Sequence, residues 1–316
     1  MNVNTEAISR SISRYYGEPN MTPQTKTYLL LGSSGFIGQH VQHKLNETDN
    51  HLRTPNHQQV DFICPDWDSI TQLLQGVDVV INMVGVMSQN AALLEKVHHD
   101  TPKQIAILAK QMGVKCWINL SALGADANHK VAFVGSKGRG DSALLQLADD
   151  EFRVIIGRPS LVFGRGGASC EMFIKLARLP VLFMPNAGNY RIQPVHVNDV
   201  VQGLVSLATK MPIPVQSIIN FTGGAVCSVA EYIAMLREDI HHKGRLTILP
   251  VPKEIAKAAV LLARPMSKGM ISQDSLTLLE EESIADNAYF TQLLEYSPLG
   301  YHAFVDKKSA ASCELT

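Results

Sequence analysis

The heptapeptide Gly32-Ser33-Ser34-Gly35-Phe36-Ile37-Gly38 decides the fold, because it follows the apolar run Thr27–Leu31 and precedes the helical stretch Gln39–Asn46. In such a loop the first glycine makes a tight turn, and the second lets the backbone approach a pyrophosphate. The third lets helix and strand pack closely. Unpaired N–H groups at the start of the helix then bind phosphates. We therefore predict that all seven residues form a dinucleotide-binding turn.

Apolar, β-branched runs alternate with helix-length segments after this loop. The runs are Val77–Val84, Lys115–Leu120 and Arg153–Ile156, and the segments between them are Ser69–Leu74, Ala91–Met112 and Ser136–Leu147. Continuous apolar strands are typical of a parallel sheet covered on both faces, and alternation with helices implies right-handed crossovers. The predicted fold class is α/β, a doubly wound parallel sheet of the Rossmann type with a smaller C-terminal region.

Three segments follow from this pattern. Residues 1–25 are expected to be a flexible extension, with a transit peptide as the alternative because this stretch holds Ser and Arg with one acid, Glu6. Residues 26–162 form the dinucleotide-binding domain. Proline and glycine then interrupt the chain, so residues 163–316 are expected to complete the Rossmann fold and to form a substrate-side lobe.

Composition excludes several classes of protein. The chain has 316 residues with 28 basic and 29 acidic side chains, a balance that argues against nucleic-acid binding. No apolar run reaches the roughly 18 residues of a membrane span. The five cysteines and the His pairs lack metal-type spacing, so we expect no metal and a cytoplasmic location. The stretch Pro252–Arg264 could touch a membrane or a partner as an amphipathic helix, although packing in the core is more common.

The choice between NAD and NADP depends on the end of the second strand, near His51–His57. An acid there favours NAD, and an Arg accommodates the 2′-phosphate of NADP. This stretch has no Asp or Glu and contains Arg53. The sequence therefore favours NADP slightly and leaves NAD open.

Several motifs together resemble those of the atypical and extended short-chain dehydrogenase/reductase superfamily. They are TYLLLGSSGFIGQ, VVINMVG, NLSALGA followed by SKGRGD, IIGRPSLVFG and QPVHVNDVVQGL, in the order of that family. The later SQDSLTLLEEESIADN is similar to the tail of a subgroup related to the nucleotide-binding accessory subunit of respiratory complex I. The resemblance covers about residues 27–304.

The resemblance implies roles for residues beyond the glycine loop. Lys137 would hold the nicotinamide ribose, and Ser121, or Ala122 in a shifted register, would stand beside a catalytic Tyr. That Tyr position, four residues before Lys137, holds Phe133, which cannot carry a proton. The remaining cofactor contacts would come from Asn82, Met83, Val84, Gly85, Arg158 and Pro159.

Two residues of the motif QPVHVNDVV call for a structural explanation as well as a functional one. Asp199 is well placed to cap the start of a helix over Val195–Leu207, so we expect it to be an N-terminal cap. His196 is either a hydrogen-bonded core histidine or a substrate contact.

Two classes of function therefore remain. The first is an NAD(P)-dependent oxidoreductase acting on a carbonyl or sugar-like small molecule, with another group in place of the Tyr. The second is a non-catalytic nucleotide-binding protein used for structure, assembly or redox sensing in a protein complex, which Phe133 favours. A weaker third is a nucleotide-sugar epimerase or dehydratase, which depends on the same Tyr.

Overall fold

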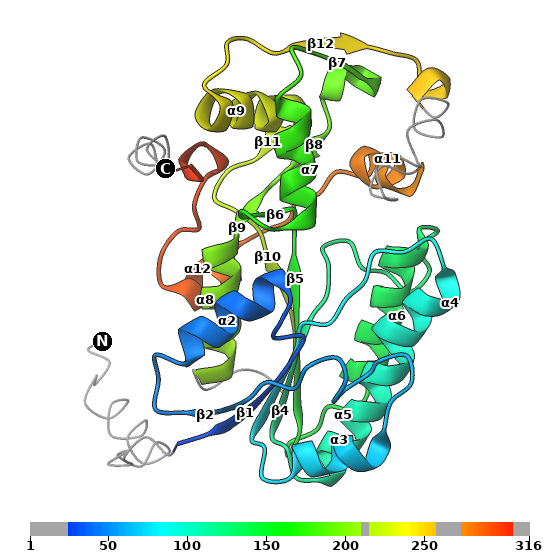
Figure 1. The fold of residues 1–316 in the computed structure, drawn as a ribbon, viewed down its shortest axis with the longest axis vertical. Helices are drawn as coiled ribbons and strands as arrows, with labels where there is room; N and C mark the ends of the chain where they lie inside the picture. Colours follow the sequence, from blue (N-terminus) through cyan, green and yellow to red (C-terminus); the bar gives the residue numbers. More distant parts are fainter. Residues whose placement is uncertain (1–24, 210–214, 257–272, 306–316) are drawn as a thin grey trace, which may run out of the picture.

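The computed structural model describes residues 25–209, 215–256 and 273–305. The predicted extension over residues 1–25 lies outside this range except for its last residue, and so does most of the predicted helix Pro252–Arg264. Figure 1 shows a sheet with helices on both sides and a smaller lobe stacked beyond one end of its strands. In the part of the chain that is described, no helix has the length and apolar character needed to cross a membrane.

The main sheet has six strands in the order β10-β5-β4-β3-β1-β2, and every neighbouring pair is parallel. The order reverses between β1 and β3, as in a doubly wound sheet, so the predicted fold class is confirmed. The central strands are fully buried, which explains their uninterrupted apolar sequences. The bounds are β1 Thr27–Leu31, β2 His51–Arg53, β3 Val79–Asn82, β4 Cys116–Leu120, β5 Arg153–Pro159 and β10 Gln216–Phe221.

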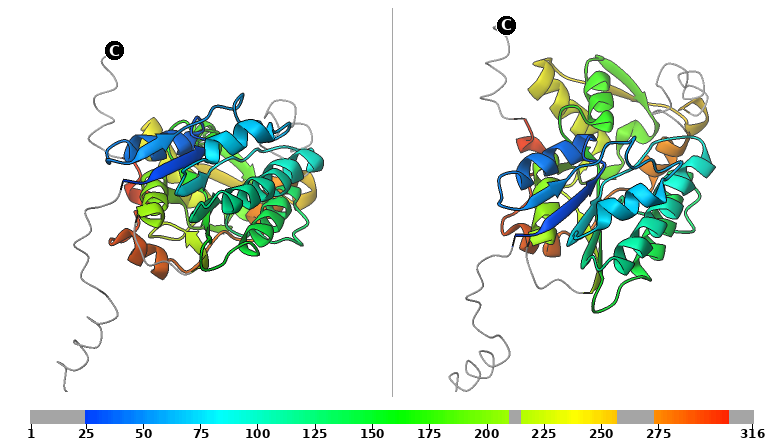
Figure 2. Two further views of the ribbon diagram at one scale, coloured as in Figure 1. Left: turned by 90° about the horizontal axis from the view of Figure 1, so that it is seen from below. Right: turned by 60° about the horizontal axis from the view of Figure 1, so that its bottom comes forward.

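Two helical layers cover the sheet, and Figure 2 shows them on opposite faces. One layer consists of α2 (Phe36–Leu45), α8 (Val197–Thr209) and α12 (Ala288–Leu294). The other consists of α3 (Trp67–Leu74), α5 (Thr101–Gln111) and α6 (Ala132–Leu145). Each layer shares its own apolar core with one face of the sheet. The last member of the first layer, α12, comes from the far end of the described chain.

Two expected helices differ from the structure. The stretch predicted as one helix from Ala91 to Met112 is divided into α4 (Ala91–Glu95), a π-helical turn η1 (Lys96–Asp100) and α5. The stretch predicted as a helix from Val195 begins instead as a short strand, β9 (Val195–His196), because Val195 pairs with Val162 of β6 (Val162–Phe163). Tertiary pairing overrides local helix preference at this point.

The smaller lobe is built around α7 (Ala168–Ala177) and α9 (Val229–His241), which share an apolar core. The start of α9 is fixed by a capping box, in which Ser228 and Glu231 each bind the other's backbone N–H. The remaining elements are β7 (Val181–Met184), η2 (Pro185–Gly188), β8 (Arg191–Ile192), β11 (Cys227–Ser228), β12 (Thr247–Pro250), α11 (Gln273–Glu280) and η3 (Tyr301–Ala303).

Asp199 connects α8 to the C-terminal part of the chain, and its predicted role as an N-terminal helix cap is wrong. Its Oδ1 accepts a hydrogen bond from the Tyr296 hydroxyl at 2.9 Å, and its Oδ2 accepts one from the Leu299 N–H at 2.9 Å. The carboxylate is almost fully buried. A buried carboxylate needs such donors, and here they come from about a hundred residues further along the chain.

Candidate functional site

The glycine loop has the geometry that a pyrophosphate requires. Gly32 has φ +82°, a conformation that favours glycine, and its carbonyl accepts a hydrogen bond from the Gly35 N–H at 3.0 Å. A Cβ on Gly38 would lie 2.1 Å from the Gly32 oxygen, so only glycine fits there. The N-cap position of α2 is Gly35, which offers no side chain to the first turn, and that turn contains no acid. The first N–H groups of α2 therefore have no side-chain acceptor and suit an anion.

The end of β3 lies directly against this loop. A Cβ on Gly32 would lie 3.0 Å from the Val84 nitrogen and 3.1 Å from the Met83 carbonyl carbon. Asn82 shapes the turn, because its Oδ1 accepts a hydrogen bond from the Val84 N–H at 3.2 Å while its amide donates to Asn119 Oδ1 at 2.7 Å. The structure thus brings 82–85 and the glycine loop together at the carboxyl edge of the sheet, where dinucleotides bind in this kind of fold.

Lys137 lies on α6, one turn after Phe133. Its Nζ donates to the Leu120 carbonyl at 3.2 Å and stands 5.7 Å from the centre of the Phe133 ring. A Cβ on Gly85 would lie 3.5 Å from Nζ, so the amine adjoins the 82–85 segment. Burial lowers the pKa of Lys137 to about 8, against an opposing effect of the Asp141 charge. The position that would hold the proton-carrying Tyr is occupied by a phenyl ring.

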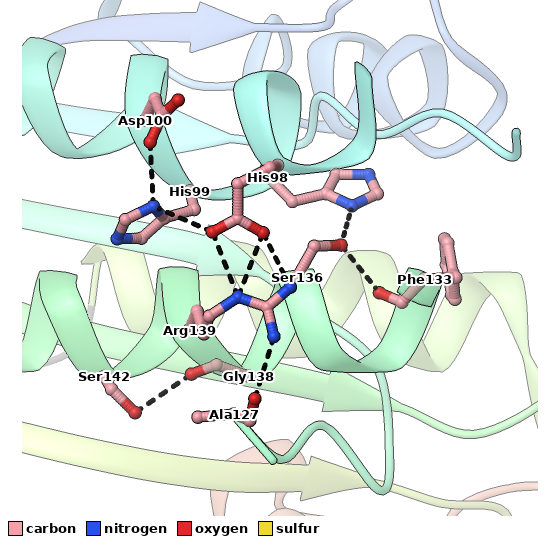
Figure 3. Close-up of polar contacts among 10 residues, drawn as sticks. His98, His99, Asp100, Ala127, Phe133, Ser136, Gly138, Arg139 and Ser142 are labelled. Carbon is pink, nitrogen blue, oxygen red and sulfur yellow. Dashed lines mark hydrogen bonds and ion pairs between the residues drawn. The ribbon is translucent and has the colours of Figure 1, made fainter. Parts of the chain in front are cut away.

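His98 belongs to the same cluster, although no sequence motif pointed to it for this role. Its Nε2 accepts a hydrogen bond from the Val86 N–H at 3.1 Å, and its Nδ1 lies 2.9 Å from Ser136 Oγ. Because a backbone N–H can only donate, the ring proton must be on Nδ1, which donates to Ser136; the serine in turn donates to the Phe133 carbonyl (Figure 3). Burial and the nearby Lys137 charge lower the pKa of His98 to about 3. His98 is therefore a neutral, fully bonded imidazole.

Ser121 is held by a carboxylate that sequence reasoning also missed. Its hydroxyl donates to Asp141 Oδ2 at 2.7 Å, and Arg158 donates to the same oxygen from Nε at 2.9 Å and from Nη2 at 2.8 Å. Asp141 is buried, and its Oδ1 has no hydrogen-bond partner among the described residues. Burial raises the pKa of this carboxyl against the lowering effect of Arg158. The only sequence signal was its place four residues after Lys137 on the same helix.

Arg53 is engaged at the end of the second strand. Its Nη1 donates to the carbonyls of Leu73 and Gln75, at 2.7 Å and 2.6 Å. These carbonyls end α3, so the guanidinium binds the negative end of that helix. Arg53 is the last residue of β2, so its charge is held at the end of the second strand.

His196 occupies an aromatic cluster in the smaller lobe. Its ring centroid lies 5.6 Å from that of Phe163 and 5.5 Å from that of Phe304. Its Nδ1 accepts from the Asn198 N–H at 3.2 Å, and burial lowers its pKa. These contacts favour the core interpretation of this histidine over the substrate contact.

One cluster has metal-type ligands, namely Glu95, His99 and Asp100. Its Glu95 is already bound by Arg139, which donates from Nε at 3.0 Å and from Nη2 at 2.6 Å. Arg139 also donates to the Ala127 carbonyl at 2.8 Å. The guanidinium supplies the positive charge that these carboxylates need, and it fastens α4 and the 126–129 turn to α6.

Residues 28–220 match the family described as NAD dependent epimerase/dehydratase, and the chain belongs to that family. The glycine loop, the 82–85 segment and Lys137 all fall within the matched residues. A nicotinamide dinucleotide is therefore the cofactor class of this chain, with the choice between NAD and NADP left open.

The chain is similar to the mouse protein named NADH dehydrogenase (ubiquinone) 1 alpha subcomplex subunit 9, mitochondrial. The two are 28% identical over 214 residues, which cover 61% of this chain and 56% of the mouse protein. The chain thus spans about half the length of the curated relatives it matches.

Solved structures share the fold at low sequence identity. A UDP-glucuronic acid 4-epimerase from Bacillus cereus, in complex with UDP-glucuronic acid and NAD, superposes with a TM-score of 0.65 and 17% identity, covering 91% of this chain and 97% of its own. A dTDP-4-dehydrorhamnose reductase from Bacillus anthracis in complex with NADP gives 0.60 and 13%, covering 73% and 86%. At this identity the likeness concerns the fold.

Proposed function

We propose that this chain binds a nicotinamide dinucleotide and uses it to stabilise a component of a protein complex, without hydride turnover of its own. The observation that carries this proposal is Phe133, which stands at the proton-transfer position beside Lys137. A phenyl ring cannot exchange a proton with a substrate hydroxyl or carbonyl.

The neighbours of Phe133 do not replace the missing hydroxyl. His98 keeps its only ring proton in a hydrogen bond to Ser136, and its pKa of about 3 keeps it neutral near pH 7. Ser121 is bound to Asp141. Groups whose protons are already bound to buried partners make a rigid wall for a cofactor but are poor proton donors.

A dinucleotide can stabilise a fold without reacting. A ligand that binds only the folded state adds stability in proportion to the logarithm of its concentration over its dissociation constant. The similarity to a complex I subunit supports a protein complex as the setting.

For the form of the cofactor, we propose NADP in preference to NAD. Arg53 is a fixed cation at the end of β2, and no carboxylate stands in 51–57 to repel a 2′-phosphate. The measurement is the ratio of dissociation constants for NADPH and NADH, in the wild type and in Arg53→Gln. Loss of NADPH preference in the variant supports the proposal, and an unchanged ratio contradicts it.

The test of the main proposal pairs binding with turnover. Calorimetry and thermal shift with the oxidised and reduced forms should show binding and a raised melting temperature. A panel of carbonyl and sugar-nucleotide substrates should show no oxidation of NAD(P)H above the blank. Measurable wild-type turnover with any of them would overturn the non-catalytic assignment.

A second candidate, an active reductase, has one observation in its favour. The lowered pKa of Lys137, about 8, gives this amine a proton that it could release near neutral pH. Phe133→Tyr distinguishes the two. If activity appears only in the variant, the chain has lost a proton donor that its family uses. If the wild type is active and the variant is no better, a group other than the residue at position 133 supplies the proton, and Lys137 is the candidate to substitute next.

For the location, the cytoplasm is our proposal from the sequence. Fractionation of cells that produce the full chain with a C-terminal tag tests it, and recovery of the tag with a membrane-enclosed organelle contradicts it.

A further inference from the structure

An apolar face is exposed at the end of the smaller lobe. β7 and β12 pair in parallel, with Val181 beside Thr247 and Phe183 beside Leu249. Because side chains alternate across a strand, these residues share one face of the two-stranded sheet. Phe183 is 66% exposed, Leu249 43% and Val181 39%, whereas Leu182 between the two β7 residues is buried in the lobe core. Leu179 and Ile255, next to the two strands, are also exposed, at 48% and 57%.

Basic side chains stand beside this face. Lys175 and Arg178 are exposed where α7 ends, and Lys243 and Arg245 are exposed where α9 leads into β12. The two places adjoin, because Lys243 Nζ reaches the Arg178 carbonyl at 3.5 Å and the Thr247 N–H donates to the Pro180 carbonyl at 3.1 Å.

A hollow of about 700 Å³ lies beside the second pair of cations. Its lining includes Lys243 and Arg245, together with the acid Glu238. Two cations therefore face one carboxylate in this lining.

The position of the face suits docking. Figure 1 places β7, β12 and the segment after α9 together at the end of the molecule farthest from the N-terminal part of the main sheet. A partner at this end would leave the glycine loop and the 82–85 segment accessible. Exposed apolar side chains that share one face of a sheet, with cations beside them, indicate a binding surface.

We propose that this face, defined as Leu179, Val181, Phe183, Leu249 and Ile255 with the basic residues Lys175, Arg178, Lys243 and Arg245, docks on an anionic lipid surface. The apolar side chains would enter the headgroup boundary, and the cations would bind lipid phosphates. Charge complementarity favours lipid over a second protein copy, since two identical basic faces would repel each other. The docking is peripheral: the side chains rest on the membrane and do not span it.

The experiment is vesicle co-sedimentation of the full chain. Vesicles of phosphatidylcholine alone are compared with vesicles that also contain phosphatidylglycerol, each at low and at high salt. We expect binding to the anionic vesicles only, and we expect high salt to weaken it because salt screens the headgroup charge. Absence of binding to anionic vesicles at low salt would overturn the proposal.

Two pairs of substitutions separate the contributions of the basic and the apolar side chains to vesicle binding. Lys243→Glu with Arg245→Glu should weaken partitioning at least about tenfold, since each basic residue near the surface contributes on the order of a few-fold. Phe183→Ser with Leu249→Ser should also weaken it. All four side chains are exposed, so circular dichroism and the melting temperature should remain those of the wild type.

The matched controls change similar side chains elsewhere. Ile63→Ser removes an equally exposed apolar group, and Lys115→Glu reverses an exposed charge at the opposite end of the sheet. Both should bind vesicles as the wild type does. Equal losses in the controls and in the paired variants would overturn the assignment of the face. So would a wild-type dimer that only the Phe183 and Leu249 substitutions dissociate in sedimentation velocity, since the face would then be a protein interface.

Discussion

Ser121 donates its hydroxyl to Asp141 across the gap between β4 and α6, at 2.7 Å. The same carboxylate oxygen accepts from Arg158, while the other oxygen is buried without a hydrogen-bond partner among the described residues. The serine that the family resemblance assigns to catalysis therefore donates a hydrogen bond that stabilises a buried acid, while Arg158 supplies the opposite charge. Loss of a donor to such a group costs more than loss of an exposed hydrogen bond.

Ser121→Ala should accordingly reduce stability and leave cofactor affinity unchanged. The expected loss is about 1–3 kcal/mol in the free energy of unfolding, because Asp141 keeps only Arg158 as a donor. Urea unfolding measures the loss, and calorimetry measures affinity. The control is Ser142→Ala on α6, the helix that carries Asp141. The Ser142 hydroxyl donates to the Gly138 carbonyl of its own helix, so its loss should change the free energy of unfolding little. A loss of cofactor affinity without a loss of stability would instead show that Ser121 contacts the cofactor.

Gly35→Asp should abolish dinucleotide binding while the protein still folds. A Cβ on Gly35 would meet only the Gly32 oxygen, at 3.2 Å, so the fold has room for it after a small shift. The new carboxylate would repel the pyrophosphate at the start of α2. We expect affinity to fall at least about a hundredfold, from the loss of a few kcal/mol. The control is Gly244→Asp, which has no atom within 4 Å of a built Cβ. Wild-type affinity in Gly35→Asp would show that the glycine loop is not the site.

Lys137→Met should stabilise the protein without cofactor and weaken cofactor binding. In the folded state the pKa of Lys137 is about 8, below the 10.5 of an unburied lysine, so the buried charge opposes folding near pH 7. Its removal should add about 1–3 kcal/mol to the free energy of unfolding, since one pKa unit corresponds to about 1.4 kcal/mol. In the wild type, stability should rise between about pH 8 and pH 10, where the unfolded chain holds more protons.

Urea unfolding of the wild type and of Lys137→Met from pH 7 to pH 10 measures both effects, the gain in stability of the variant and the rise in stability of the wild type with pH. Lys115→Met is the exposed control. A variant that is destabilised at pH 7 and binds cofactor normally would show that the lysine has a purely structural role.

The parts of the fold that could be predicted are those set by local pattern. Thr27–Leu31 followed by the glycine loop predicts a strand, a turn and a helix, and these form as β1 and α2. The apolar runs became β3, β4 and β5 because a strand buried on both faces needs apolar residues throughout. Asn82 and Lys137 could be selected because motifs fix their positions relative to these strands.

The parts that could not be predicted depend on contacts between distant elements. His98 contacts Ser136, which is 38 residues further along the chain, and it does so from the π-helical turn η1. Hydrophobic periodicity in the sequence does not predict such a turn. The capping rule selected Asp199 for a local role, but Tyr296 and Leu299 hold it instead. No sequence pattern assigned a role to Asp141, whose buried network depends on Arg158 and Ser121 from other elements.

His98 should make the stability of the protein depend on pH in the mildly acidic range. Its pKa is about 3 in the folded state, whereas an unburied histidine has a pKa of 6.5, so below pH 6.5 the unfolded chain takes up a proton that the folded chain refuses. The stabilisation present above pH 6.5 is therefore lost as the pH falls, by about 2 kcal/mol at pH 5. His98→Gln should lower the stability at pH 7.5 through weaker hydrogen bonds. It should also remove the contribution of His98 to the slope of the free energy of unfolding against pH.

Urea unfolding at several pH values between 7.5 and 5 gives the slope, and His57→Gln serves as the exposed control. His196, whose pKa is also lowered, contributes to the wild type and to both variants, so it cancels in the difference between them. If the slope in His98→Gln equals that of the wild type, then His98 accepts a proton in the folded state. The hydrogen bond from the Val86 N–H to His98 would then have to break, and the protonated His98 beside Phe133 could donate a proton to a bound substrate.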